Sequence, residues 1–180
     1  MHQSIKRILL NIIIAVVLIG CNSKTSLQSY FVDHQEVANF ITLDLPTTLV
    51  DLDETEFTKE EKEAYNSIKR LNFLGYKIEE NGIDEYTSEL TFVETILSHK
   101  KYIELAEFNY NGAKIIVKYI GDDDLVDELI VFGNSKDTGF GIVRVLGKKM
   151  SPEKMATLVN VMQNANIDQS QLSGITDFFK

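Results

Sequence analysis

The sequence predicts an α+β fold with two layers, in which one mainly antiparallel sheet of about five strands has its helices packed on one face. Two observations predict this class. Three β-branched, apolar runs follow one another at residues 113–120, 126–133 and 139–147, and short turn sequences separate them. Short connections make consecutive strands antiparallel neighbours. The segments with helical spacing are amphipathic, so each has one apolar side to place against the sheet.

The first half of the domain alternates between strand and helix. A strand is predicted at residues 39–46, because apolar and polar side chains alternate there until a proline ends the run. A helix is predicted at residues 58–71. It opens with Thr58 and, three residues later, Glu61, as in a capping box, and its apolar residues recur at helical spacing. A second strand is predicted at residues 72–78.

Residues 84–108 have helical spacing and are predicted to form a pair of helices with a break near Ser98. The last predicted helix follows the third apolar run, where Ser151 and Pro152 supply an N-cap and a proline at the first helical position. Residues 166–180 show no clear period and form a C-terminal tail. With all helices on one face, the other face of the sheet is expected to carry charged side chains, solvated or bound to a partner: Lys114, Lys118 and Arg144.

The N-terminus has the features of a secretory signal peptide. Lys6 and Arg7 form a small positive region, and an apolar run at residues 8–19 follows, interrupted only by Asn11. This run is shorter than the about 20 apolar residues that a membrane-spanning helix needs. Its length is typical of the apolar part of a signal peptide.

The next residues, Leu18, Ile19, Gly20 and Cys21, resemble the lipobox of bacterial lipoprotein signal peptides. The resemblance implies that a diacylglycerol is joined to the Cys21 thiol and that the chain is then cut between Gly20 and Cys21. Acyl chains such as palmitate on Cys21 would hold the protein on the membrane, since two or three chains anchor far better than one. The alternative is an uncut anchor with an incidental cysteine.

The predicted organisation is a signal peptide at residues 1–20, a lipidated N-terminus with a short tether at 21–29, a single α+β domain at 30–165 and the tail at 166–180. The tether is short, so the domain is expected to lie close to the membrane. Asn22, not an aspartate, follows the cysteine. By resemblance to known lipoprotein sorting rules, this favours the outer membrane, with the domain facing the periplasm.

Charge and cysteine content exclude some classes of function. The chain has a formal net charge of −9, and loss of Lys6 and Arg7 with the signal peptide makes it −11. A protein this acidic is not expected to bind nucleic acid or to dock electrostatically on anionic lipid. Cys21 is the only cysteine, so the folded domain contains no disulfide and depends on its hydrophobic core.

The stretch NGAKIIVKYIGDDDLVDELIVFG, followed by GFGIVRVLGKKMSPEKMATL, resembles the domain of unknown function 4252 family of small bacterial envelope lipoproteins. The resemblance covers roughly residues 30–162 and rests on the pattern of strands and turns. It implies an envelope lipoprotein with an α+β domain. It implies no activity, cofactor or catalytic residue.

The sequence offers few candidates for chemistry. After processing, the histidines are His34 and His99, and neither lies in the context of a nucleophile elbow. Zinc would need three or four grouped ligands, which the spacing does not provide. The acidic loop with Asp122 and Asp124 is a candidate calcium site, but it lacks the spacing and central glycine of an EF-hand, so a β-turn with a solvated acidic surface is favoured. We therefore predict no enzymatic activity and no cofactor.

The expected function is that of a non-catalytic lipoprotein domain that binds a protein partner in the cell envelope. The expected contact regions are the open face of the sheet and two aromatic residues of the tail, Phe178 and Phe179, for which packing into the core is the alternative. The other possibility is a small-ligand-binding lipoprotein or an enzyme whose site the spacing does not reveal. A deep pocket with convergent polar groups would favour that possibility.

Overall fold

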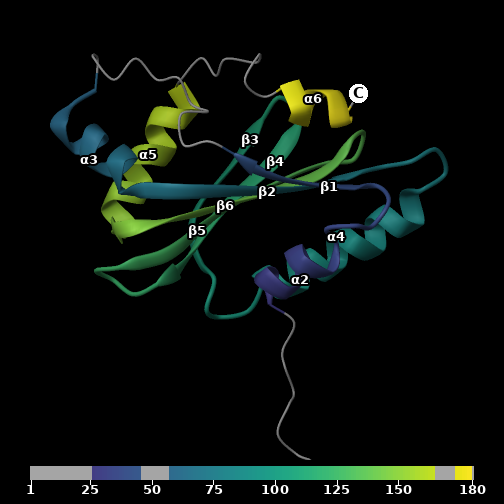
Figure 1. Cartoon of the computed structure of the whole chain (residues 1–180), viewed down its shortest axis with the longest axis horizontal. Helices are drawn as coiled ribbons and strands as arrows, with labels where there is room; N and C mark the ends of the chain where they lie inside the picture. The colour runs from purple at the N-terminus through teal and green to yellow at the C-terminus, as the bar shows by residue number, and fades with distance from the viewer. Residues whose placement is uncertain (1–25, 46–56, 165–172, 180) are drawn as a thin grey trace, which may run out of the picture.

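Six strands form one sheet through the middle of the molecule, with helices on either side (Figure 1). This computed structural model describes residues 26–45, 57–164 and 173–179. The described elements are, in chain order, α2 (Leu27–Asp33), β1 (Phe40–Leu45), α3 (Lys59–Ser67), β2 (Ile68–Lys77), α4 (Ile83–Leu97), β3 (Ile103–Tyr110), β4 (Ala113–Gly121), β5 (Val126–Ser135), β6 (Gly139–Met150), α5 (Pro152–Asn164) and α6 (Ser173–Phe179).

The sheet is antiparallel throughout, with the strand order β1-β2-β6-β5-β4-β3. The three predicted C-terminal strands, β4, β5 and β6, pair in succession, as their short connections require. β2 lies on the other side of β6, and β1 forms the edge beside β2. The α+β class and the mainly antiparallel sheet are therefore confirmed.

The sixth strand, β3, lies where the sequence predicts the second helix of a pair. The first helix of that pair is α4, and Ser98 is its C-cap residue, so the predicted break is confirmed. The prediction of a second helix is wrong, because residues 103–110 form a strand that makes a hairpin with β4 through a turn at residues 111–112. A β-bulge at Leu105 shifts the alternation of side chains, so the apolar residues of this strand are spaced as on a helix.

Helices cover both faces of the sheet, not one face as predicted. α2 and α4 lie on one face, and α3 and α5 lie on the other (Figure 1). The central strands explain this arrangement, because they are apolar on both sides. In β5, Leu129 faces α3 and α5 while Ile130 faces α2 and α4, and both are almost fully buried. Such strands need a cover on each face, so the domain has three layers.

Two hydrophobic cores result, one on each face of the sheet. The core between the sheet and α2 and α4 is rich in aromatic rings: Tyr30, Tyr76, Tyr86, Phe132 and Phe140. The core beneath α3 and α5 is mainly aliphatic, and its fully buried members include Leu129, Met150 and Met155. The aromatic core lies beneath α2 and α4, the two helices that form the candidate functional site.

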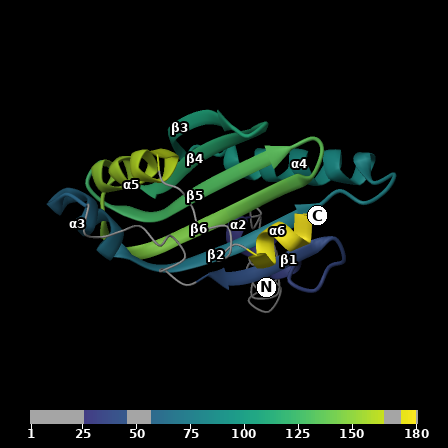
Figure 2. The same cartoon turned by 90° about the horizontal axis from the view of Figure 1, so that it is seen from above.

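The C-terminal tail contains a described helix, α6, which packs against β2 on the same side of the sheet as α3 and α5 (Figure 2). Phe178 and Phe179 lie on it, with their ring centroids 5.1 Å apart. Both side chains are half-buried, so they are neither core residues nor a fully exposed surface. A partner contact at these two rings stays a prediction.

The charged residues predicted for an open sheet face lie on the face that carries α2 and α4, and they have partners within the chain. Arg144 makes two bonds to Glu128, at 2.6 and 2.9 Å, and both side chains are only 11% exposed. The ring of Phe31 from α2 lies 5.2 Å from Cζ of Arg144. Lys114 and Lys118 each pair with a glutamate of β3. The prediction of a solvated or partner-bound Arg144 is therefore wrong.

Replacing Glu128 by leucine is expected to lower the free energy of unfolding by about 3 kcal/mol, because the Arg144 guanidinium stays buried without its carboxylate. The double variant Glu128→Leu with Arg144→Met should recover most of this loss, since an apolar pair of similar volume replaces the ion pair. Urea denaturation of the three proteins measures both effects. A double variant no more stable than the single one would contradict this account of the pair.

Candidate functional site between helices α2 and α4

A capping box fixes the start of α2, the first described helix. Ser26 Oγ accepts the backbone N–H of Ser29 at 3.1 Å, and Ser29 Oγ accepts the backbone N–H of Ser26 at 2.9 Å. Leu27 follows at once and is only 1% exposed. Residues 27–29 of the predicted tether at 21–29 are therefore helical and belong to the packed domain, so the prediction is wrong for these three residues.

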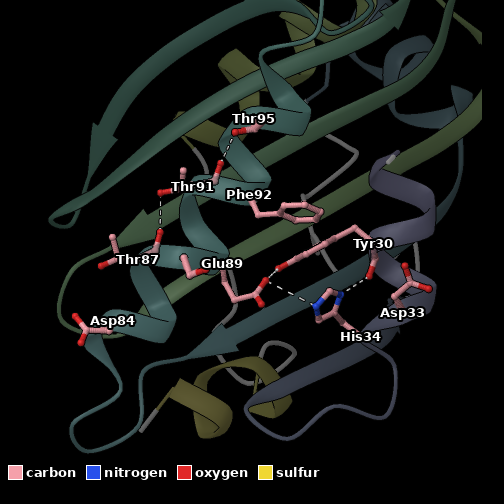
Figure 3. Close-up of a pocket in the computed structure, with 10 residues that line it drawn as sticks. Tyr30, Asp33, His34, Asp84, Thr87, Glu89, Thr91, Phe92 and Thr95 are labelled. Carbon is pink, nitrogen blue, oxygen red and sulfur yellow. Dashed lines mark hydrogen bonds and ion pairs between the residues drawn. The ribbon is translucent and has the colours of Figure 1, made fainter. Parts of the chain in front are cut away.

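α4 lies beside α2 on the same face of the sheet (Figure 1). Its buried residues face the aromatic core: Tyr86, Val93, Ile96 and Leu97. Its other side carries a row of threonines one helical turn apart, Thr87, Thr91 and Thr95 (Figure 3). α4 thus has an apolar side against the sheet and a hydroxyl-bearing side directed away from it.

A groove of about 790 Å³ runs between the two helices (Figure 3). α2 lines it with Tyr30, Asp33 and His34, and α4 lines it with Asp84, Thr87, Ser88, Glu89, Thr91, Phe92 and Thr95. Seven of these ten residues are exposed, so the groove is an open surface channel and not an enclosed pocket. It lacks the depth expected of a small-ligand site.

Three side chains connect α2 and α4 at the base of the groove. The Tyr30 hydroxyl donates a hydrogen bond to Glu89 Oε2 at 2.7 Å, and His34 Nε2 lies 3.7 Å from the same oxygen. His34 Nδ1 lies 2.7 Å from the backbone carbonyl oxygen of Tyr30. A carbonyl only accepts, so Nδ1 carries the proton in that bond. The Tyr30 and His34 rings also contact each other, with centroids 4.0 Å apart.

The contacts among Tyr30, His34 and Glu89 join α2 to α4 and do not by themselves form a catalytic arrangement. In the part of the chain that the structure describes, no serine, threonine or cysteine side chain hydrogen-bonds to His34. His99 follows α4, and its Nδ1 accepts the backbone N–H of Lys101 at 3.4 Å. Among the described residues, His34 is therefore not part of a Ser-His-Asp arrangement. That the protein is not an enzyme stays a prediction.

Burial raises the pKa of the Tyr30 hydroxyl far above its ordinary value, and the hydrogen bond to Glu89 raises it further. Burial likewise raises the pKa of Tyr76 and that of Tyr86, which lie in the same aromatic core. In each case the low-polarity surroundings disfavour the phenolate, so the folded protein holds these three protons more tightly than the unfolded chain does.

The free energy of unfolding is expected to fall as the pH rises above about 10, the ordinary pKa of tyrosine. The unfolded chain ionises there while Tyr30, Tyr76 and Tyr86 stay neutral in the folded protein. Their contribution is thus complete below the unfolded pKa and is lost as the pH rises through the folded pKa values.

Urea denaturation from about pH 8 to about pH 11, with tyrosinate absorbance followed in parallel, measures this effect. The chain has no tryptophan, so tyrosinate absorbance is not masked by another chromophore of that kind. Tyr30→Phe should weaken the pH dependence. Ionisation of all seven tyrosines in a protein that is still folded would contradict the expectation.

The candidate calcium residues lie in the turn between β4 and β5. Asp122 Oδ1 accepts the backbone N–H of Asp124 at 2.9 Å and that of Leu125 at 2.8 Å, and these bonds lower the pKa of the Asp122 carboxyl. Within the described residues, no three histidine, cysteine, aspartate or glutamate side chains are grouped as a metal ion requires. The carboxylate of Asp122 therefore serves the turn.

The residues of the predicted lipobox, Leu18, Ile19, Gly20 and Cys21, lie outside the described residues. Among the helices that the structure describes, none is both long enough and apolar enough to cross a membrane.

The groove is not predictable from the sequence, because its two sides are far apart in the chain. Tyr30 and Glu89 are separated by 59 positions, and no spacing rule connects them. One signal was visible, since Thr87, Thr91 and Thr95 recur every four residues, on the polar side of a helix. That regularity marks a face of α4 but does not show what lies opposite it.

The structure defines an α+β domain with a six-stranded antiparallel sheet between two layers of helices. A family model described as "Domain of unknown function (DUF4252)" matches residues 33–158. The chain belongs to this family, as its strand and turn pattern predicts. No significant match was found among curated proteins or among solved structures.

Proposed function

We propose that the protein is a cell-envelope lipoprotein, anchored through acyl chains on Cys21, whose domain binds a protein partner at the membrane surface. The observation that carries the proposal is the close spacing of the lipobox and the folded domain. α2 is capped at Ser26, five positions after Cys21. Five extended residues reach at most about 18 Å, so the face with α2 and its groove stays near the anchor.

The form of the groove supports a protein partner over a small ligand. Its lining is mostly exposed, and the polar groups of Tyr30, His34 and Glu89 bond to one another at its base. A small-ligand carrier or an enzyme would need polar groups that converge on an enclosed volume. An open channel between two helices instead offers a long surface to a partner segment.

In-cell crosslinking followed by mass spectrometry tests the proposal on the full chain at its natural expression level. The matched control is an unrelated soluble domain joined to residues 1–25 of this chain, so that it has the same predicted anchor and tether. We expect one or a few envelope proteins to be enriched with the protein and not with the control. Capture of the same abundant neighbours by both would contradict the proposal.

A further inference from the structure

We propose that the groove between α2 and α4 binds a segment of the protein partner that carries lysine or arginine side chains. This inference rests on the proposed function and names the chemistry of the partner. Four properties of the groove support it: its charge, the direction of its hydrogen bonds, its exposed apolar side chains and its length.

The charge of the groove is of one sign. Its lining contains three carboxylates, those of Asp33, Asp84 and Glu89, and no lysine or arginine. The chain after predicted processing has a formal net charge of −11, so the field of the whole domain has the same sign as the groove. A cationic segment would be attracted from a distance and then matched locally, whereas an anionic one would be repelled.

Three threonine hydroxyls of the groove donate their protons to the backbone of α4. Thr87, Thr91 and Thr95 each donate a hydrogen bond of 2.7 Å to the backbone carbonyl four residues earlier. A hydroxyl whose proton is used in this way can offer a ligand only its lone pairs. The row of threonines along α4 is therefore a row of hydrogen-bond acceptors.

The remaining donors at the base of the groove are also engaged. The Tyr30 hydroxyl donates to Glu89, and His34 Nδ1 lies at hydrogen-bond distance from the Tyr30 carbonyl oxygen. Together with the carboxylates, which only accept, these groups give the groove more acceptors than free donors, and Ser88 is the one lining hydroxyl outside this set. Lysine and arginine are the side chains that offer several donors and no acceptor, so they fit this surface best.

Exposed apolar side chains suit the stems of such residues. Phe92 lies in the groove with 44% of its surface exposed, beside the ring of Tyr30 at a centroid distance of 5.7 Å. Ile83 is not one of the lining residues, but it precedes Asp84 at one end of the groove and is 53% exposed. The methylene groups of lysine and arginine can lie on these surfaces while the charged ends reach the carboxylates. An aromatic face also attracts a cation directly.

The length of the groove favours a peptide over a single ammonium group. From Asp84 to Thr95 the lining follows α4 for about 16 Å, at about 1.5 Å per residue. An extended peptide covers that length with about five residues, so several cationic side chains can bind at once. A lipid headgroup would occupy only a fraction of it.

Binding of hexa-arginine to the full chain in detergent tests the inference, with hexa-glutamate as the control peptide. The groove variant is Asp33→Asn with Asp84→Asn, which removes two exposed charges and keeps side-chain size. The matched control is Asp123→Asn with Asp124→Asn, which removes two exposed charges from the β4–β5 turn. We expect the groove variant to lose about tenfold in affinity and the turn variant less than about twofold.

Equal losses in the two variants would overturn the inference, because they would reflect net charge alone. Absence of hexa-arginine binding would overturn it as well. Ethanolamine provides a further arm, since it presents the ammonium group of a lipid headgroup without a peptide. Competition by ethanolamine as strong as that of hexa-arginine, at equal concentration of cationic groups, would identify a small-cation site and contradict a peptide-binding groove.

Photocrosslinking in cells separates this inference from the proposed function. A photoreactive residue replaces Thr91 in the groove, and in the control it replaces Lys62 on the opposite face of the domain. We expect the partner to be captured from Thr91 through a lysine- or arginine-bearing segment and not from Lys62. Capture of a partner from Lys62 alone would overturn the groove and leave the proposed function standing. Capture from neither position, with no partner in the chemical crosslinking, would overturn both.

Discussion

Phe140→Ala is expected to lower the free energy of unfolding by about 3–5 kcal/mol, which is enough to unfold much of a domain of ordinary stability. Phe140 lies on the central strand β6 and is only 1% exposed. Its ring stacks on that of Tyr76 at a centroid distance of 5.3 Å and contacts the rings of Phe40, Tyr86 and Phe132. Alanine would leave a cavity among rings that cannot all move to fill it.

Phe92→Ala is the matched control, because it removes the same atoms from a side chain that is 44% exposed. Its cost should be below about 2 kcal/mol, since much of the ring is already in water. Urea denaturation of both variants, analysed with a common slope, gives the two differences in the free energy of unfolding. Similar losses for Phe140→Ala and Phe92→Ala would contradict the position of the aromatic core.

The sequence predicts the helices well where local signals and packing agree. The capping box at Thr58 and Glu61 is present in α3, with the Glu61 backbone N–H donating to Thr58 Oγ1 at 3.2 Å. Ser151 accepts the backbone N–H of Lys154 at 3.3 Å at the start of α5. These features are encoded by residues three apart, so one sequence is enough to find them.

The ends of helices and strands are harder to predict where the apolar residues fit both helical and strand spacing. The predicted helix at residues 58–71 ends at Ser67, and β2 begins at Ile68. Ile68 and Leu71 are three residues apart, which suits a helix, yet both are buried in the strand. A register shift where β2 pairs with β6, between Ile68 and Arg70, accounts for this spacing. The boundary between α3 and β2 therefore depends on the pairing of β2 with β6, which is distant in the chain. The local sequence pattern does not show that pairing.

The groove is the part that the sequence predicts least. It needs α2 and α4 on one face of the sheet, whereas the amphipathic patterns show only that each helix has an apolar side. Which face a helix covers depends on the path of its connections and on the free space over the sheet. His34 illustrates the point, since a polar segment near the N-terminus becomes half-buried when α2 docks beside Glu89.

Cys21→Ser is expected to abolish lipid attachment, because a serine hydroxyl cannot form the thioether that a lipobox cysteine forms. The mutant chain should accumulate as the uncut precursor, with residues 1–20 still attached. Ser23→Ala, two residues later, is the control and should be lipidated and cut as the natural chain is. This variant has the largest expected effect, because lipid attachment should be lost completely. Membrane anchoring at Cys21 is also the central claim of the proposed function.

The most direct measurement is incorporation of labelled palmitate into the full chain in cells, read together with the size of the chain. The proposed function predicts label on the natural chain and on Ser23→Ala, both at the processed size, and no label on Cys21→Ser at the precursor size. A Cys21→Ser chain that still carries palmitate and is still cut at the normal position would contradict it.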